Sequence, residues 1–449
     1  MHIVLAFFLL QILFTFLVKD YIPDLRVYGI LMVLSSIVAI SIFLFRTVER
    51  KWLWLIYTGF AIRVLTLFVD LYVPSISIFS SGSDSEYFHT ASVSIAEGLL
   101  PVSAGRTYYV PFLSGIYYMI GDQRLYAQFL NIAFWVFSAV YLLKSFRYLK
   151  VGNQVTFISL GIFALMPNSI FMSSILLRES IIVFLISMSL HYFLLWFYER
   201  NILHFILAAI PALGSMIFHA GMVGFIIAYV LAFIFMTQEG RASGKKKSSK
   251  VLYLLFIGLL LVVLSMNNEL FLGKFQDFGE DGVDSIKLAG NGGSAYLTNL
   301  EGISGLAIYA VAPIKMIYFM FSPLPTDWRG FGDIISFLMD SSIYFFLIVA
   351  IAIGLIKSDM SIRNKIMIAT FIFITVFIYS YGTGNAGTAI RHRNKLLPML
   401  LILFTIVQSR SAVKLPEAIT KHIKGAKNER LANYRVAEVA TLRETRDIK

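Results

Sequence analysis

The feature that most restricts the fold of this chain is a succession of apolar segments, each close to the length that one bilayer crossing requires. The hydrocarbon core of a bilayer is about 30 Å thick, and a helix needs roughly 20 apolar residues to cross it. The 449 residues are 58% hydrophobic and 14% charged, with a mean hydropathy of +0.77. A soluble domain carries about a quarter charged residues. We therefore predict an all-α polytopic membrane protein.

Apolar run length predicts about twelve transmembrane helices. Two further apolar stretches, 108–121 and 304–331, do not fit a crossing between their flanking loops, and we interpret them as outer-surface or re-entrant elements. The predicted spans lie at 2–18, 27–45, 52–69, 124–143, 155–175, 180–197, 203–217, 220–236, 251–268, 334–356, 366–383 and 396–409.

Basic residues concentrated in short loops predict the orientation, because cytoplasmic loops carry an excess of Lys and Arg. The segments 46–51, 144–150, 237–250 and 357–365 are predicted to be cytoplasmic, as are both termini. One transmembrane domain then covers 1–409, with outer loops at 70–123 and 269–331, and a basic cytoplasmic tail covers 410–449. This loop bias accounts for the net charge of +12 without a nucleic-acid partner.

Several common chemistries are excluded by missing residues or motifs. The chain has no cysteine, which excludes disulfides and thiolate sites, and it has no phosphate-binding glycine loop or dinucleotide fingerprint. We predict no cofactor and no metal. A divalent cation remains an option at Asp277, Glu280, Asp281 and Asp284, but their spacing matches no known calcium loop, and a solvated loop is the simpler interpretation.

Asp84, Glu86 and His89 lie together just outside the third predicted span, in a segment with helical spacing from Ser85 to Leu100. A carboxylate in this place is a candidate general base for an acceptor hydroxyl, and we single out Asp84 and Glu86 as candidate catalytic residues. The competing interpretation is that Asp84 caps the helix and Glu86 is solvated.

Arg178 and Glu179 follow a long apolar run. Ionisable residues at membrane depth are costly and indicate function by default, and an arginine can clamp a phosphate with two parallel hydrogen bonds. A local ion pair between the two residues explains them equally well.

A basic cluster precedes the last predicted span and consists of Arg391, His392, Arg393 and Lys395. Our topology places it outside, against the usual charge bias, so it needs another reason to exist. Binding an anionic lipid headgroup or a diphosphate supplies that reason. The alternative is that the topology is inverted in this region.

Four isolated ionisable residues are further candidates for a functional site. Arg63 lies in the third predicted span, His219 at an outer hairpin tip, and Lys315 and Arg329 in the second surface element. Any of them could face a hydrophilic cavity, although a single histidine is more often structural. We include His89, His219 and Arg329 among the candidate substrate-binding residues.

Three segments together resemble the N-terminal half of GT-C superfamily glycosyltransferases, the polytopic fold of protein-mannosyltransferase-like and aminoarabinose-transferase-like enzymes. They read SGSDSEYFHTASVSIAEG, YYVPFLSGIYYMIGDQRLYAQFLNIAFW and FALMPNSIFMSSILLRES, and the late RHRNKLLPML is similar to the arginine-rich approach to a late helix in that family. The chain departs from the family in having Val110–Pro111 in place of a double proline and in lacking a large soluble C-terminal domain.

This resemblance implies a membrane glycosyltransferase that uses a polyprenyl-(di)phosphate-linked sugar donor at the outer face of a bacterial cytoplasmic membrane. It implies a role in cell-envelope polysaccharide synthesis, with membrane lipids and other polysaccharide-assembly proteins as partners. By position, Asp84 would be the base, with Glu86 as the alternative, and Arg178, Arg391 and Arg393 would bind the donor phosphate. A Wzy-type polymerase of lipid-linked oligosaccharides and a flippase of lipid-linked sugars are the two alternatives.

Overall fold

The structure is a computed structural model of the whole chain, and it describes residues 2–73, 82–105, 107–199, 201–240, 294–297 and 310–409, without the side chains of 2–5 and 233–240. Within these residues the protein is helical, and the only extended pairing is a single bridge between Ala295 and Asn385. The predicted all-α membrane class is confirmed at this level. The predicted span 251–268, the acidic stretch 277–284 and the tail 410–449 lie outside the described residues.

Six helices in the described ranges are long and apolar enough to cross a bilayer, or seven if one bent pair counts as a span. The bent pair is α7 (Asn153–Leu165) followed by α8 (Pro167–Ser174), with an angle of 47° between them. The predicted number of twelve is therefore not confirmed. The six long helices are α2 (Leu25–Thr47), α3 (Arg50–Tyr72), α6 (Arg124–Tyr148), α9 (Glu179–Glu199), the continuous run Phe331–Lys357 and α18 (Ile362–Tyr381).

The run Phe331–Lys357 comprises α16 (Phe331–Ser336), a π-turn (Phe337–Ser341) and α17 (Ser342–Lys357). The remaining helices are shorter: α1 (His2–Val18), α4 (Gly82–Ala96), α5 (Tyr109–Ile120), α10 (Ile202–Phe218), α11 (Val223–Gly240), α15 (Ala312–Phe321), α19 (Ala386–Asn394) and α20 (Leu397–Gln408). A helix of twelve residues such as α5 is only about 18 Å long and cannot span the hydrocarbon core alone.

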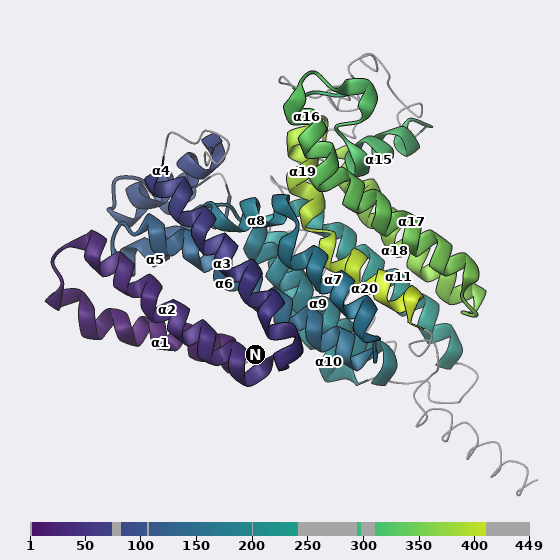
Figure 1. Cartoon of the computed structure of the whole chain (residues 1–449), viewed down its shortest axis with the longest axis horizontal. Coiled ribbons are helices and arrows are strands. Elements are labelled where there is room, and N and C mark those ends of the chain that lie inside the picture. Colours follow the sequence, from purple (N-terminus) through teal and green to yellow (C-terminus); the bar gives the residue numbers. More distant parts are fainter. Residues whose placement is uncertain are drawn as a thin grey trace, which may run out of the picture.

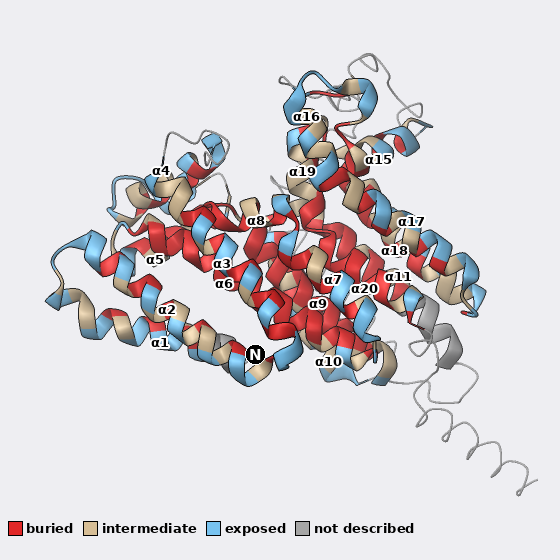
Figure 2. Cartoon of the chain, in the orientation of Figure 1, coloured by how far each residue is buried: buried red, intermediate tan, exposed pale blue. Residues whose placement is uncertain are grey.

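The central element of the fold is α6, which is buried along nearly its whole length. It packs against α9, α3 and α2, and α9 in turn packs along α10 (Figure 1). Figure 2 shows buried residues concentrated in this middle layer and exposed residues on the outward faces of α1, α2 and α17. Many of the outward side chains are apolar, for example Phe16, Leu34 and Phe345, and such faces suit contact with lipid.

The predicted continuous span 155–175 is interrupted at Met166 and Pro167, because proline is favoured at the first position of a new helix and disfavoured inside one. The break leaves carbonyl groups at the end of α7 without helical partners. Arg63 of α3 satisfies one of them, because its Nη1 donates to the carbonyl oxygen of Ala164 at 2.7 Å. Its Nε also donates to Ser173 Oγ of α8 at 2.8 Å.

Arg63 is fully buried, and its guanidinium lies 3.7 Å from the ring centroid of Trp135. The expectation that this arginine faces a hydrophilic cavity is therefore wrong. A cation at the C-terminal end of a helix is also favoured by the helix dipole. Arg63 holds the broken pair α7–α8 against α3 and α6.

The bundle has two chemically different ends, separated by the length of α6. At one end, Arg147 pairs with Glu49 at 2.9 Å and Lys51 donates to Asn153 at 3.2 Å, which joins the ends of α3, α6 and α7. Short basic loops lie at this end. At the other end α4, α5, α8 and α19 come together (Figure 1).

We predict that Arg63→Met lowers the free energy of unfolding by about 2–4 kcal/mol, because it leaves the carbonyl oxygen of Ala164 without this donor and removes the hydrogen bonds to Ser169 and Ser173. Thermal unfolding in detergent, followed by tryptophan fluorescence, measures the change. Arg50→Met on the same helix is the matched control, since Arg50 is exposed, and it should unfold at the wild-type midpoint. Equal midpoints for the two variants would contradict the structural role of Arg63.

Candidate functional site

The site is built around Glu179, the first residue of α9, whose side chain is only 1% exposed. The chain between α8 and α9 is held in place by Asn131 of α6, whose Nδ2 donates to the carbonyl oxygens of Ile175 at 2.7 Å and Leu177 at 2.9 Å. A carboxylate in the first turn of a helix is favoured by the helix dipole. Glu179 is thus fixed at a buried helix N-terminus.

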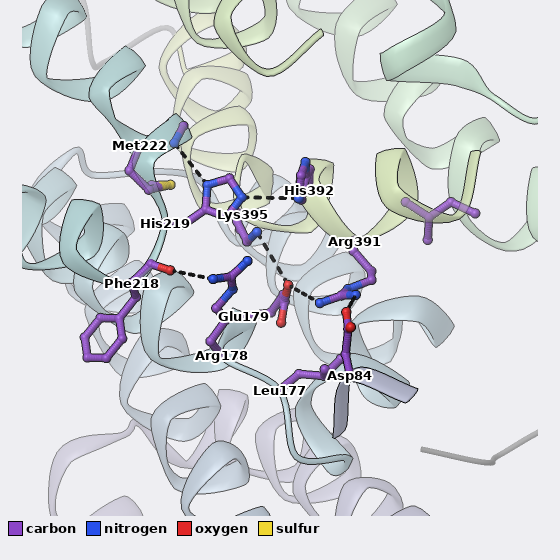
Figure 3. Close-up of polar contacts among 12 residues, drawn as sticks. Asp84, Leu177, Arg178, Glu179, Phe218, His219, Met222, Arg391, His392 and Lys395 are labelled. Carbon is purple, nitrogen blue, oxygen red and sulfur yellow. Dashed lines mark hydrogen bonds and ion pairs between the residues drawn. The ribbon is translucent and has the colours of Figure 1, made fainter. Parts of the chain in front are cut away.

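Two cations from one face of α19 and the following turn contact this carboxylate. Arg391 Nη2 lies 3.2 Å from Glu179 Oε1, and Lys395 Nζ lies 3.5 Å from the same oxygen. Residues four apart on a helix lie on the same side, so a single face supplies both cations. Through its other terminal nitrogen, Nη1, Arg391 forms an ion pair with Asp84 of α4 (Figure 3).

Arg178 adds a third cation beside Glu179. Its Nη1 donates to the carbonyl oxygen of Phe218 at 3.1 Å, at the C-terminal end of α10. The next residue, His219, stacks on the ring of Tyr379 with centroids 5.4 Å apart, and Tyr379 also lies 6.0 Å from Lys395 Nζ. The end of α10 and the end of α18 therefore wall the cluster on the side away from Asp84.

His219 and His392 meet through their Nε2 atoms at 3.2 Å (Figure 3). The backbone N–H of Gly221 donates to His219 Nδ1 at 3.1 Å, so the neutral ring carries its proton on Nε2 and donates it to His392. His392 then carries its own proton on Nδ1, which lies 3.2 Å from Thr383 Oγ1. This hydrogen-bonded pair of imidazoles joins α19 to the α10 terminus.

We call Asp84, Arg178, Glu179, Arg391 and Lys395 the anion cluster. Three cations face two carboxylates, which leaves one net positive charge before the histidines are considered. Exposure rises across it: the side chains of Lys395 and Glu179 are buried, Arg391 is 24% exposed and Asp84 is 54% exposed. The cluster is therefore reached from the side of Asp84, and its charge suits a negatively charged group.

Among the three cations of the cluster, Lys395 loses its proton most readily. Burial lowers its pKa to about 7, while Glu179 acts in the opposite direction. The charge of the anion cluster therefore depends on pH near neutrality.

Glu86 and His89 lie on α4 with Asp84 but point to other partners. Glu86 forms a two-point ion pair with Arg124 at 2.6 and 2.8 Å, and this pairing lowers the pKa of the Glu86 carboxyl. His89 Nδ1 lies 3.1 Å from the hydroxyl of Tyr117. These two residues fasten α4 to α5 and α6, and the structure does not bring them to the anion cluster.

Arg393 is likewise separate from the anion cluster, although it lies two residues from Arg391. It is fully buried, ion-paired with Asp340 of the π-turn, and its Nη2 donates to Ser341 Oγ at 3.0 Å. Its Nη1 also donates to the carbonyl oxygen of Met320 at 3.1 Å. The charge is compensated inside the protein, so the structure gives Arg393 a structural position and no access to a substrate.

Arg329 is placed beside α16, where its Nη2 donates to the carbonyl oxygen of Ala295 at 2.6 Å. It lines a small cavity of about 20 Å³ together with Asp327 and Asp333, and none of the residues that line this cavity belongs to the anion cluster. Lys315 is buried in α15, with its Nζ 3.5 Å from the carbonyl oxygen of Tyr381.

Sequence reasoning missed Asp340 and Asn131. Asp340 is an acidic residue within an apolar run that was assigned as a span, and that position is itself a signal of a buried partner. Asn131 carries no such signal, because one amide in a helix is common. In the described ranges no three His, Asp or Glu side chains are close enough to hold a metal ion together.

No protein family, curated protein or solved structure matches this chain in comparisons of its sequence and its fold.

Substitutions of Arg391 and Arg393 should have different effects on stability and on anion binding. Arg393→Gln should lower the free energy of unfolding by about 3–5 kcal/mol, because Asp340 stays buried without its cation. Arg391→Gln should unfold within about 1 kcal/mol of wild type, because its site is partly exposed and Glu179 retains Lys395. It should instead weaken sulfate binding about tenfold. Thermal unfolding and isothermal titration calorimetry measure the two effects, and the reverse pattern would contradict the assignment.

The affinity of the anion cluster for an anion should depend on pH. A protonated Lys395 attracts an anion and a neutral one does not, so sulfate affinity should fall as pH rises through about 7. Sulfate is the probe because it stays a dianion over this range. In Lys395→Arg the charge persists, so the affinity should stay flat between about pH 6 and about pH 9. An unchanged slope in this variant would assign the titration to another group.

Proposed function

We propose that this protein is a membrane glycosyltransferase that uses a polyprenyl-phosphate- or polyprenyl-diphosphate-linked sugar as its donor. The observation that carries the proposal is the anion cluster: three cations and an accessible carboxylate meet at one end of a helical membrane protein. The GT-C resemblance of the segments that hold Asp84 and Arg178 supports the same function. Both residues take part in this cluster, although they are far apart in the sequence.

An anionic headgroup suits the site for electrostatic and geometric reasons. Arg178, Arg391 and Lys395 converge on a partly desolvated region, where charge-assisted hydrogen bonds to phosphate oxygens are stronger than in water. The helices around the cluster present apolar outward faces, so a substrate with a lipid chain can stay in the bilayer while its headgroup reaches the helix ends.

The proposed reaction is a displacement at the anomeric carbon of the donor sugar. Asp84 removes the proton from the acceptor hydroxyl, and the acceptor oxygen forms a bond to the anomeric carbon. The bond between that carbon and the phosphate oxygen breaks, and its electron pair stays on the phosphate. The cations of the cluster stabilise this developing negative charge, as an oxyanion hole does in acyl transfer.

The orientation we propose follows from the opposite end of the bundle. Lysines and arginines gather there in short connections, which the positive-inside tendency assigns to the cytoplasm. The anion cluster then faces outward from the cell membrane. Those residues are Arg46, Arg50, Lys51, Lys144, Arg147, Lys150, Lys357, Arg363 and Lys365.

We predict that Asp84→Asn reduces turnover of a polyprenyl-phosphate-linked sugar by at least about a hundredfold, because the amide cannot accept the acceptor proton. Purified protein in detergent is assayed for donor release and for a new glycosidic product. Glu97→Gln is the control, an exposed carboxylate that follows the end of α4, and it should keep wild-type turnover.

The length of the product and the behaviour of Asp84→Asn distinguish a single-transfer enzyme from a polymerase and from a flippase. A product longer than one transfer would indicate a polymerase of repeat units. Transport of a lipid-linked sugar across vesicles that survives Asp84→Asn, without any glycosidic product, would contradict an enzyme and favour a flippase.

A further inference from the structure

We propose that Asp84 acts as an internal competitor for the anion: it occupies Arg391 in the ligand-free protein, and an incoming phosphate displaces it. The displacement frees the Asp84 carboxylate, so on the proposed function the donor must bind before the acceptor can be deprotonated. The anion exchange itself rests on the cluster geometry, whereas the order of the reaction rests on the proposed function.

The first argument is the way Arg391 divides its two terminal nitrogens. Nη2 faces Glu179 at 3.2 Å, and Nη1 is taken by Asp84. A guanidinium that binds a phosphate oxygen pair offers two parallel N–H groups. The edge that carries Nη1 is therefore the one a ligand must take, and Asp84 occupies it.

The second argument is the difference in exposure between the two carboxylates. Glu179 is 1% exposed, whereas the Asp84 side chain is 54% exposed. Removing Glu179 from its two cations would leave a buried charge uncompensated, which is strongly unfavourable. Releasing Asp84 returns a carboxylate to water, and an exposed ion pair of this kind is worth little. Asp84 is thus the replaceable partner.

The third argument is that α4 does not need Asp84 to stay in place. Glu86 binds Arg124, His89 contacts Tyr117, and the hydroxyl of the buried Ser92 donates to the carbonyl oxygen of Val110 at 3.1 Å. The helix is fastened to α5 and α6 by residues on its other positions. A rotation of one aspartate side chain is sufficient to open the site, without movement of the helix.

Charge matching favours the exchange. With Asp84 in place the cluster carries one net positive charge, and without it the cluster carries two. A phosphate monoester, such as the lipid phosphate that leaves a phosphate-linked donor, carries a charge of about −1.5 to −2 near neutral pH. The two net positive charges of the cluster without Asp84 therefore neutralise such a phosphate group. In the ligand-free protein, the Asp84 carboxylate supplies part of that negative charge.

The test measures binding of inorganic pyrophosphate to the purified full-length protein at pH 7 by isothermal titration calorimetry. Asp84→Asn should bind pyrophosphate about tenfold more tightly than wild type, because the competitor for Arg391 is gone. Glu97→Gln is the control: it removes one negative charge from an exposed residue just past the end of α4, roughly 20 Å from Asp84 along the helix, and should change the affinity by less than about twofold, since salt screens a charge beyond about 10 Å.

A double-mutant cycle locates the effect. In an Arg391→Gln background, Asp84→Asn should give no gain, because the contested cation is absent. The proposal is overturned if Asp84→Asn fails to raise the affinity, if Glu97→Gln raises it equally, or if neither wild type nor Asp84→Asn binds pyrophosphate. A tenfold gain in Asp84→Asn together with no donor turnover by wild type would support the exchange and reject the proposed function.

Discussion

The ion pairs of Glu179 are the interaction on which the site depends. A carboxylate with 1% exposure is unfavourable inside a protein unless cations and hydrogen bonds compensate it. Arg391 and Lys395 supply the compensation from one face of α19 and the turn after it. This requirement brings α19 against the start of α9, and Arg391 then extends the contact to α4. One buried charge thus joins three segments that are far apart in the sequence.

Interrupted helices place these charges. Glu179 begins a helix because the chain breaks between α8 and α9, and Asn131 holds that break by binding two carbonyl oxygens. Arg63 bridges the break between α7 and α8 by donating to the carbonyl oxygen of Ala164 and to Ser173 Oγ. In a bilayer, exposed carbonyl groups have no water to bind, so irregular backbone is tolerated only where side chains satisfy it. The position of the site therefore depends on the hydrogen bonds that Asn131 and Arg63 donate at these two breaks.

The sequence predicted the class of fold well and the arrangement of the site only partly. Run length located α3, α6 and α9 to within a few residues, because an apolar stretch of 20 residues has few other uses. It also located the short helices α4 and α5, as the helical segment from Ser85 to Leu100 and the surface or re-entrant element 108–121. It did not reveal the break at Pro167, which depends on tertiary packing. For the site, charge at membrane depth identified Arg178 and Glu179, and a basic cluster on the predicted outer side identified Arg391. Residue type alone did not separate Arg391 from Arg393.

Those two arginines differ because a helix turns by about 100° per residue, so positions two apart lie on nearly opposite faces. On one face, Arg393 and Asp340 form a closed, fully buried pair, and Arg393 donates additional hydrogen bonds to Ser341 Oγ and to backbone carbonyl oxygens. Such a pair holds its helix firmly. On the other face, Arg391 meets a partly exposed aspartate that can leave. With only nine residues, α19 has few contacts that can hold it in place. The buried Arg393–Asp340 pair fixes the helix, and this leaves Arg391 on the opposite face within reach of a ligand.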